Sequence, residues 1–445
     1  MIFILRCTKT YKICKKWYKI AIFINYKTLR ILMVTKYDAF EIVYKNKALL
    51  KPIEVVKKLN KDEREYHIIH RYLRELADEN LLIKKKGGFQ VEISEKTELL
   101  YNLILYCIKN GINYNLILDK NFAQFISMSL QREEISSKSI KLNPRTVKKY
   151  VEILDRYGLI LIISEKPLRA KVFYNVLLNN LLVYFKYKHL VFTKSYRNYI
   201  PEIKKELEFY RKLKKKDEAK YRKIVNEFGI SFIYHSLSLE GNPITLPDTI
   251  KILKENLIPA NLKTTDVDEV KNYQEAMFQM LKDTNERKSL SIQSILDYHR
   301  LAMRHQTYLA GSIRTIPVHI KGNPNFKTTP IEKIKEELDR LFDKYNEFIK
   351  RKNVPLEEIL KFAVYFHNEF QHIHPFVDGN SRTTRLITFH LLQSLDIPII
   401  DIPFGLLDEY LSYTKGSKNR EDSKLYQNLQ KIILFNLKKI NKRMA

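Results

Sequence analysis

Residues 371–385 read Gln371-His372-Ile373-His374-Pro375-Phe376-Val377-Asp378-Gly379-Asn380-Ser381-Arg382-Thr383-Thr384-Arg385. Upstream, apolar residues recur at helical spacing from Pro355 onward, which predicts a helix that Pro375 ends. Downstream, the run from Asp378 to Ser381 predicts the start of a second helix. The sequence therefore predicts two helices joined by a tight loop that carries His374.

This loop combines residue types that suit phosphate chemistry. A glycine-rich entry to a helix presents unpaired backbone N–H groups and the positive end of the helix dipole. Arg382 and Arg385 lie three residues apart, on one face of the first turns, where two guanidinium groups can clamp a polyphosphate. His374 lies beside this anion site, and Asp378 can hold a divalent cation against phosphate oxygens. The residues predict phosphate-ester chemistry with a histidine base, one Mg²⁺ and two arginines.

Two other interpretations of the same residues stay open at this point. His367, His372, His374 and Asp378 are also a ligand set for zinc or iron. Alternatively, His374 is an ordinary core histidine. Both leave the Gly379-Asn380 pair and the two arginines unexplained.

The stretch resembles the Fic (Fido) family motif, H-P-F-x-D/E-G-N-G-R-x-x-R, with Ser381 standing where the family usually has glycine. The resemblance extends over about residues 195–445. It implies that His374 deprotonates a Ser, Thr or Tyr hydroxyl of a target protein, which then attacks the α-phosphate of ATP. The other roles it implies are Mg²⁺ binding by Asp378, an anion hole from Gly379, Asn380 and Ser381, phosphate contact by Arg382 and γ-phosphate binding by Arg385.

Two further segments resemble parts of the same family. Ser236-Leu237-Ser238-Leu239-Glu240-Gly241-Asn242 is similar to its inhibitory helix, which implies that Glu240 pairs with Arg385 and that Ser236 hydrogen-bonds nearby. An ordinary helix ending at a glycine is the alternative. Residues 310–323 resemble its β-hairpin flap, whose edge would bind the target backbone; a plain hairpin is the alternative. The expected edge residues are Ile316, Val318 and Ile320.

The N-terminal half twice shows helices followed by a hairpin pattern, which looks like a winged helix-turn-helix. In the second copy, Asn143 and Pro144 predict a helix start. That helix would carry Arg145, Lys148 and Lys149 outward, in the manner of a DNA-recognition helix. Winged helices also serve as protein–protein adaptors, and that alternative stays open.

Charge is distributed unevenly along the 445 residues. The chain has 79 Lys and Arg and 50 Asp and Glu. Residues 1–230 contain 48 of the basic and 24 of the acidic residues, a net charge of +24, so residues 231–445 have a net charge of only +5. Such asymmetry favours an anionic partner such as nucleic acid, although a general lysine bias in the proteome is an alternative. Three cysteines without a CxxC pair indicate a reducing cytoplasm. The longest uncharged stretch has 14 residues, too short to span a membrane.

These observations predict a mainly α protein: an all-helical Fic domain with a small β-hairpin flap, after one or two α+β winged-helix domains. The expected function is transfer of AMP from ATP to a protein hydroxyl, autoinhibited by Glu240. Removal of AMP, transfer of another phosphate-containing group, and a DNA-binding regulator that senses nucleotide are the rivals. A homodimer is left open. The expected segments are a 1–33 extension with an uncertain translation start, winged-helix-like domains at 34–96 and 97–192, and a Fic domain at 193–445 with its inhibitory helix at about 230–241.

Overall fold

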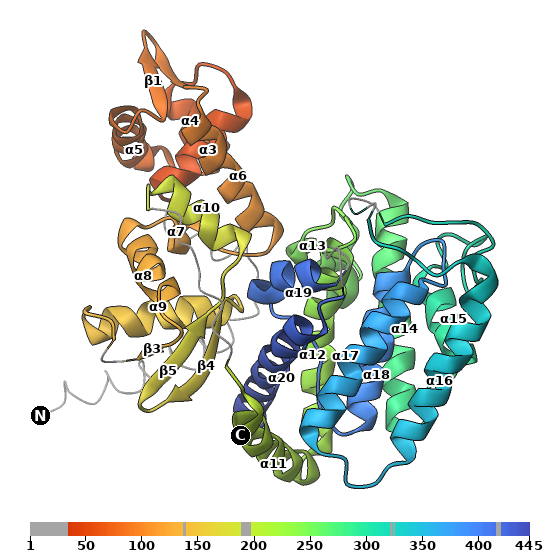
Figure 1. The fold of residues 1–445 in the computed structure, drawn as a ribbon. Coiled ribbons are helices and arrows are strands. Elements are labelled where there is room, and N and C mark those ends of the chain that lie inside the picture. Colours follow the sequence, from red (N-terminus) through yellow and green to blue (C-terminus); the bar gives the residue numbers. More distant parts are fainter. Residues whose placement is uncertain (1–33, 137–138, 188–196, 321–322, 324, 415–419) are drawn as a thin grey trace, which may run out of the picture. The chain divides into compact units, whose positions relative to one another are not determined.

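A computed structural model describes residues 34–136, 139–187, 197–320, 323, 325–414 and 420–445 (Figure 1). The chain forms two compact units, one up to Leu118 and the other from Asp119 onward. The predicted extension at residues 1–33 lies outside the described residues. Helices dominate both units, and the described strands form a two-stranded and a three-stranded sheet, so the expectation of a mainly α fold is confirmed.

The described part of the first unit, from residue 34 to Leu118, has three α-helices and a hairpin, followed by two more α-helices. The antiparallel strands pair Leu82 with Val91, and Gly87 between them has φ +99°, a conformation that favours glycine. The helix predicted from Pro52 and the strand–turn–strand predicted at 80–91 are both formed. The elements are α3 (Lys36–Asn46), α4 (Pro52–Lys58), η1 (Glu63–Glu65), α5 (Tyr66–Asp78), β1 (Leu82–Lys85), β2 (Gly88–Val91), α6 (Glu95–Lys109) and α7 (Tyr114–Ile117).

This first unit extends beyond residue 96, the boundary expected from the sequence. The hydroxyl of Tyr114 in α7 donates a hydrogen bond to Asp38 Oδ1 in α3 at 2.5 Å, in a buried position. Residues 97–118 therefore pack with the first set of helices. The assignment of either unit to the winged-helix class stays a prediction.

The second unit begins with another helix–hairpin arrangement. As predicted, Asn143 caps the helix that starts at Pro144, since its Oδ1 accepts a hydrogen bond from the Arg145 amide at 2.9 Å. The hairpin strands lie at 160–165 and 168–172, so the second is earlier and shorter than expected. The elements are α8 (Lys120–Leu130), β3 (Ile135–Ser136), α9 (Pro144–Arg156), β4 (Ile160–Glu165), β5 (Leu168–Val172) and α10 (Val176–Tyr184), with sheet order β3-β5-β4.

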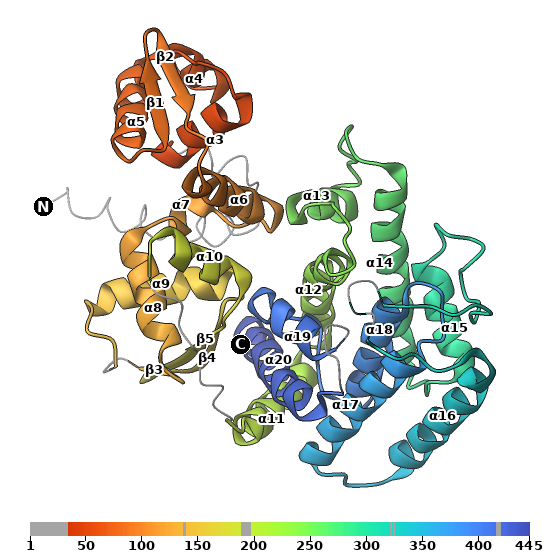
Figure 2. The same cartoon turned by 45° about the horizontal axis from the view of Figure 1, so that its top comes forward.

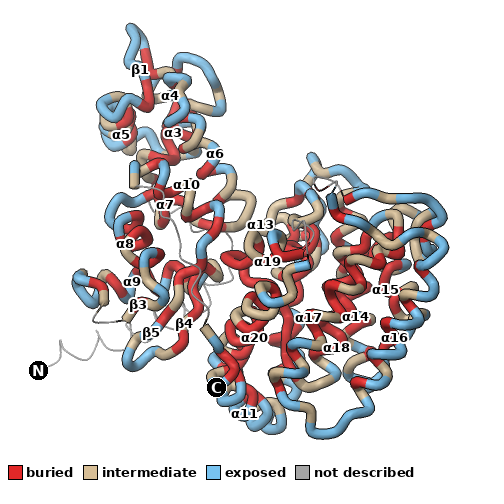
Figure 3. The backbone as a smooth tube through the Cα atoms, viewed as in Figure 1, coloured by how far each residue is buried: buried red, intermediate tan, exposed pale blue. Residues whose placement is uncertain are grey.

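The remainder of the second unit is a helical bundle (Figure 2). Helix α18 packs against α17, α14 and α15. Figure 3 shows buried residues along each of these helices, where they pack against one another in the bundle. The elements are α11 (Ile200–Lys216), α12 (Glu218–Ser238), α13 (Leu246–Ile250), η2 (Lys251–Glu255, a π turn), α14 (Thr264–Asn285), α15 (Ile292–Ala302), η3 (Ile331–Lys333), α16 (Ile334–Lys350), α17 (Leu356–Ile373), α18 (Asn380–Ser394), η4 (Phe404–Leu406), α19 (Leu407–Tyr413) and α20 (Asp422–Met444).

The lysine-rich sequence of residues 193–226 would suggest one charged, solvated helix, but the structure differs. Its described part is divided between α11 and α12, which meet at Asp217, whose side chain caps α12. Helix α11 packs against α20 through buried residues that include Leu207 and Tyr210. Five of the six lysines of α11 are exposed, so the helix is amphipathic although its composition is highly charged.

Helix α20 also contacts α9 and strand β4 of the second unit. Lys439 Nζ donates to Asp155 Oδ1 at 2.7 Å, and Lys438 Nζ donates to the Ile163 carbonyl at 2.9 Å. In the part of the chain that the structure describes, none of the helices has both the length and the apolar character needed to cross a bilayer.

Candidate active site

The loop between α17 and α18 has a backbone conformation that its sequence imposes. His374 ends α17 in the left-handed region at φ +49°, its amide still bonded to the Phe370 carbonyl at 3.0 Å, and Pro375 prevents the helix from continuing. Gly379 precedes α18 at φ +79°, and a Cβ there would lie 3.0 Å from His299 Nε2. Glycine is therefore required at 379 for both its φ and its closeness to α15.

Asn380 closes this loop on itself. Its Oδ1 accepts from the Phe376 amide at 2.9 Å, and its Nδ2 donates to the Phe376 carbonyl at 2.8 Å. Phe376 is fully buried and stacks on His299, with ring centroids 3.7 Å apart. Asn380 and Phe376 thus fix the shape of the loop from within.

The first turn of α18 presents backbone amides without intrahelical partners. The first amide bonded within the helix is that of Thr383, which donates to the Gly379 carbonyl at 3.0 Å. Gly379 has no side chain to cap the preceding amides. The N–H groups of Asn380, Ser381 and Arg382 therefore form a helix N-terminus of the kind that binds anions.

The imidazole of His374 is neutral, and the structure indicates its tautomer. Its Nδ1 lies 3.1 Å from the Gln371 carbonyl, which can only accept, so Nδ1 carries the proton and Nε2 keeps its lone pair. Burial lowers the pKa of His374 to about 4, outweighing the hydrogen bond to Gln371, which favours the protonated form. His374 can therefore accept a proton at Nε2 at neutral pH.

Arg385 is held by the segment that ends α12. Its Nε donates to Ser236 Oγ at 2.6 Å, and its Nη2 donates to Glu240 Oε1 and to the Ser236 carbonyl, both at 3.0 Å. The guanidinium is only 2% exposed. Burial disfavours its charge, but Glu240 together with Tyr273 and Tyr410 outweighs that effect and raises the pKa of Arg385. The contact expected between Glu240 and Arg385 is thus present.

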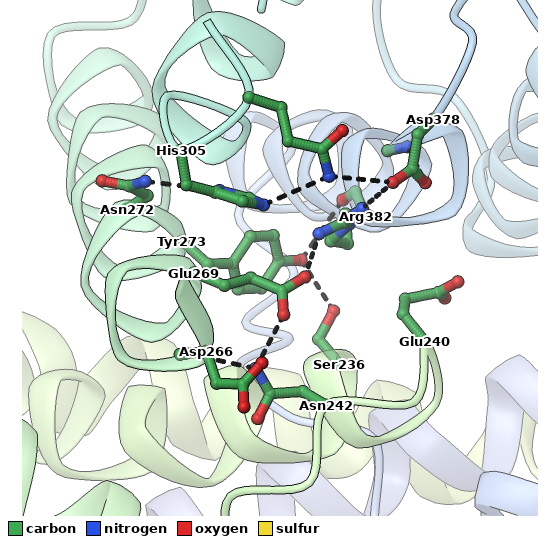
Figure 4. Close-up of polar contacts among 12 residues, drawn as sticks. Ser236, Glu240, Asn242, Asp266, Glu269, Asn272, Tyr273, His305, Asp378 and Arg382 are labelled. Carbon is green, nitrogen blue, oxygen red and sulfur yellow. Dashed lines mark hydrogen bonds and ion pairs between the residues drawn. The ribbon is translucent and has the colours of Figure 1, made fainter. Parts of the chain in front are cut away.

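Arg382 is held by two other carboxylates (Figure 4). Its Nη1 donates to Glu269 Oε1, from α14, and its Nη2 lies 3.1 Å from Asp378 Oδ2. The side chain is 3% exposed, and its buried Nε has no hydrogen-bond partner among the described residues. Both arginines of the motif therefore face carboxylates in this structure.

Asp378 is the most exposed group of this cluster, with 52% of its side chain accessible. Partial burial alone would raise the pKa of its carboxyl group. Arg382 and the Gly379 amide, which donates to Oδ1 at 2.6 Å, outweigh this effect, and the pKa of Asp378 is lowered. Asp378 is therefore an ionised carboxylate at the solvent-exposed edge of this cluster.

The comparison with protein families agrees with this geometry. Residues 289–392, from just before α15 to Leu392 in α18, match the Fic/DOC family. This chain contains a Fic domain.

Curated relatives are similar to less than half of this chain. The protein adenylyltransferase Fic of Drosophila erecta is 27% identical over 198 residues, which are 44% of this chain and 39% of that protein. The protein of the same name from Nematostella vectensis is 26% identical over 194 residues, 43% of this chain and 44% of that one. The chain thus spans less than half the length of these relatives.

Two solved structures are among those to which this chain shows some similarity. A Fic domain-containing signaling protein from Bacteroides thetaiotaomicron has a TM-score of 0.47 and 20% identity, with 56% of this chain and 98% of that chain covered. Fic-1 from C. elegans has a TM-score of 0.42 and 17% identity, with 79% and 92% covered.

The predicted flap hairpin of the Fic domain is not formed, because the described residues between 310 and 323 include no strand. Pro317 removes a ladder donor at the centre of the segment. Arg314 instead anchors it: its amide donates to the Pro375 carbonyl at 2.8 Å and its Nε to the His374 carbonyl at 2.8 Å. The expected edge residues differ in exposure, with Ile316 53% exposed, Val318 intermediate and Ile320 buried.

The histidines of the alternative zinc or iron site have separate surroundings. His367 is bonded to Tyr410 and Asn368, whereas His372 stacks on Phe326 with ring centroids 4.5 Å apart. The described residues include no group of three or more His, Cys, Asp or Glu side chains placed to hold a metal ion. The ligand set proposed for that alternative is therefore not assembled.

Sequence reasoning missed several residues that shape this site. His299 accepts from the Gly311 amide at 2.9 Å through Nδ1 and donates from Nε2 to the Asp378 carbonyl at 2.9 Å, so it ties two loops together. Glu269 and Asn242 were missed as well. Asn242 ends the segment that resembles the inhibitory helix but was given no role, and no local pattern marks His299 or Glu269, because their partners lie far away in the chain.

The proposed DNA contacts lie on α9. Arg145, Lys148 and Lys149 are exposed there, while Val147, Tyr150 and Val151 on the other side are buried, as the periodicity predicted. Lys148 is 4.0 Å from Glu152. DNA binding stays a prediction.

Buried neutral histidines make the stability of the Fic domain dependent on pH. Burial lowers the pKa of His299 and of His367 from 6.5 to about 4. Between pH 6.5 and pH 4 the native state binds fewer protons than the unfolded state. The free energy of unfolding is therefore highest above pH 6.5 and decreases as the pH falls. At pH 5 the expected loss is about 2 kcal/mol for each such imidazole.

Thermal unfolding at pH 7 and pH 5 tests this expectation. The midpoint should be lower at pH 5, and His367→Gln should narrow the difference because glutamine does not titrate. The matched control is His319→Gln, at an exposed position, which should leave the difference unchanged. Equal midpoints at the two pH values would contradict the argument.

Proposed function

We propose that this chain is a protein adenylyltransferase, which transfers AMP from ATP to a hydroxyl group of a target protein and is held inactive by Glu240. The observation that carries the proposal is the neutral His374, with its Nε2 lone pair, in the loop that opens the anion-binding end of α18. The names of the curated relatives support the same reaction class.

In the proposed reaction, the ATP phosphates lie at the amides of Asn380, Ser381 and Arg382, where the helix dipole and the side chain of Arg382 offset their charge. His374 Nε2 takes the proton of the target Ser, Thr or Tyr hydroxyl. The hydroxyl oxygen forms a bond to the α-phosphorus as the bond to the bridging oxygen breaks, and pyrophosphate leaves with that electron pair. The products are the AMP ester of the protein, pyrophosphate and one proton on His374.

The residues present fit a magnesium ion. Asp378 is ionised and half-exposed beside the proposed phosphate site, and Mg²⁺ is commonly bound through one or two carboxylates together with substrate phosphates. Asp378 would hold the ion, which when bound neutralises charge on the phosphate oxygens. The absence of a larger ligand cluster among the described residues is compatible with such a site.

The proposed inhibition acts through Arg385. This guanidinium would hold the γ-phosphate, but Glu240 Oε1 lies 3.0 Å from its Nη2 and Ser236 occupies its Nε. A triphosphate that reached the site would have to displace a carboxylate from a buried cation. Glu240 therefore disfavours the productive position of ATP.

The target protein would approach along residues 313–320. Arg314 donates to the His374 carbonyl and to the Ile316 carbonyl, which supports an approach of the target near the exposed Ile316. An extended target segment lying there would bring a hydroxyl toward Nε2.

Substitution of Glu240 by glycine tests the proposal. In purified Glu240→Gly protein with Mg²⁺ or Mn²⁺, we expect self-labelling from ATP labelled at the α-phosphate to exceed that of the native chain by about 10- to 100-fold, the factor expected when one charge-assisted hydrogen bond is removed. ATP labelled at the γ-phosphate should give no labelling, and intact mass should increase by one AMP.

Two controls make the outcome specific. Glu240→Gln keeps the size of the side chain and removes its charge, so it should also raise labelling, whereas Glu255→Gly, at an exposed position, should not. Absence of α-label from the Glu240→Gly chain with either metal would count against the transferase proposal.

A further inference from the structure

The segment that follows α12 is hydrogen-bonded to α14 through the side chain of Asn242. Asn242 is 6% exposed, and its Nδ2 donates to Glu269 Oε2 at 2.6 Å and to the Asp266 carbonyl at 3.2 Å. Its Oδ1 accepts from the Ile244 amide at 3.0 Å, which closes a local turn. Asn242 therefore joins the end of the inhibitory segment to a different helix.

Glu269 receives this contact while it also binds Arg382. One carboxylate oxygen accepts from Arg382 and the other from Asn242, and the side chain is 15% exposed (Figure 4). A carboxylate shared between two donors in a poorly hydrated site fixes the position of both. The Glu240 segment and the motif helix thus meet at one side chain of α14.

Glu240 itself lies beyond the last residue of α12, so the helix does not fix its position. The chain turns at Gly241, with φ +97°, and the Asn242 amide donates back to the Leu237 carbonyl at 3.1 Å. This backbone turn shapes the segment, but it provides no contact with the body of the bundle. The Asn242 side chain supplies that contact two residues after Glu240.

We propose that Asn242 is a positioning residue for inhibition: by hydrogen bonding to Glu269, it latches the segment that places Glu240 against Arg385. The inference rests on the proposed function and extends it, because it assigns the stability of the inhibited state to a contact that involves neither Glu240 nor Arg385. Loss of this contact shifts the segment toward positions in which Arg385 is available to phosphate. One hydrogen bond to a buried carboxylate corresponds to a shift of about 10- to 100-fold in that equilibrium.

Asn242→Asp isolates the latch. Aspartate has the same shape, and its carboxylate can still accept from the Ile244 amide, but it has no donor for Glu269 and adds a negative charge beside it. The matched control is Asn198→Asp, because Asn198 Oδ1 accepts from the Ile200 amide at 3.1 Å in the same kind of local turn, on an exposed residue. Asn242→Ser, whose hydroxyl keeps an acceptor for the turn but is too short for Glu269, serves if the aspartate variant does not fold.

Two readouts on the full chain test the latch. Hydrogen exchange of the amides at 237–242 should be about 10-fold faster or more in Asn242→Asp than in the native chain or in Asn198→Asp. Self-labelling from α-labelled ATP should rise toward the level of Glu240→Gly. Asn242→Asp should add nothing to labelling in a chain that already carries Glu240→Gly, since there is then no carboxylate to position.

The outcomes separate the latch from the proposed function. Unchanged exchange at 237–242 overturns the latch, and so does labelling that rises in Glu240→Gly but not in Asn242→Asp. Faster exchange in a protein that Glu240→Gly fails to activate supports the latch and contradicts the transferase. A further rise in labelling when Asn242→Asp is added to Glu240→Gly also overturns the latch, because Asn242 would then act on something other than Glu240.

Discussion

Replacement of His374 by alanine in the Glu240→Gly chain is expected to slow AMP transfer by about 10²- to 10⁴-fold, the usual contribution of a positioned general base. The reason is the position of the proton on the His374 ring. With Nδ1–H bonded to the Gln371 carbonyl, Nε2 is the basic atom, and a pKa of about 4 keeps it unprotonated at neutral pH. Single-turnover labelling with saturating ATP measures the effect on the chemical step.

The neighbouring imidazole of His372 provides the control. Its ring stacks on Phe326, so His372→Ala in the same background should reduce labelling no more than a small loss of stability would. ATP binding should be similar in His374→Ala and its parent. Labelling that persisted in His374→Ala would contradict the assignment of the base.

Replacement of Arg385 by alanine in the Glu240→Gly chain is expected to weaken ATP binding by about 10- to 100-fold, the range for loss of a charge-assisted hydrogen bond. The guanidinium is almost fully buried, so a phosphate bound to it would be poorly screened by water. Calorimetric titration with ATP and Mg²⁺ measures the change.

Arg385→Lys separates charge from geometry. Lysine keeps the charge but not the planar fork that donates to Ser236 and to a phosphate together, so it should restore only part of the affinity. Equal ATP affinity in Glu240→Gly and in the double variant with Arg385→Ala would mean that Arg385 does not bind phosphate. The proposed mode of inhibition would then be wrong.

Much of the site was predictable because its signals are local. Pro355 and Pro375 limit α17, Gly379 requires a left-handed φ, and Asn143 caps α9, each through interactions within a few residues. The contact between Glu240 and Arg385, 145 residues apart, came from a family resemblance and not from periodicity. Its inhibitory role stays a proposal.

The parts that sequence reasoning missed depend on distant partners. Glu269 is one of several acidic residues on α14, and nothing in the helical pattern distinguishes it from solvated neighbours, although it meets Arg382 113 residues later. The flap hairpin was expected from a family resemblance, but its described residues form no strand, and the contacts of Arg314 determine the path of that segment. In both cases, tertiary contacts with charged groups override the local pattern.

The most direct measurement is a crystal structure of the Glu240→Gly chain with Mg²⁺ and an ATP analogue that resists cleavage between the α- and β-phosphates. We expect density for the triphosphate at the amides of residues 380–382, the γ-phosphate in contact with Arg385, and the α-phosphate facing Nε2 of His374. A triphosphate bound away from α18, or one whose α-phosphate lies out of reach of His374, would contradict the account.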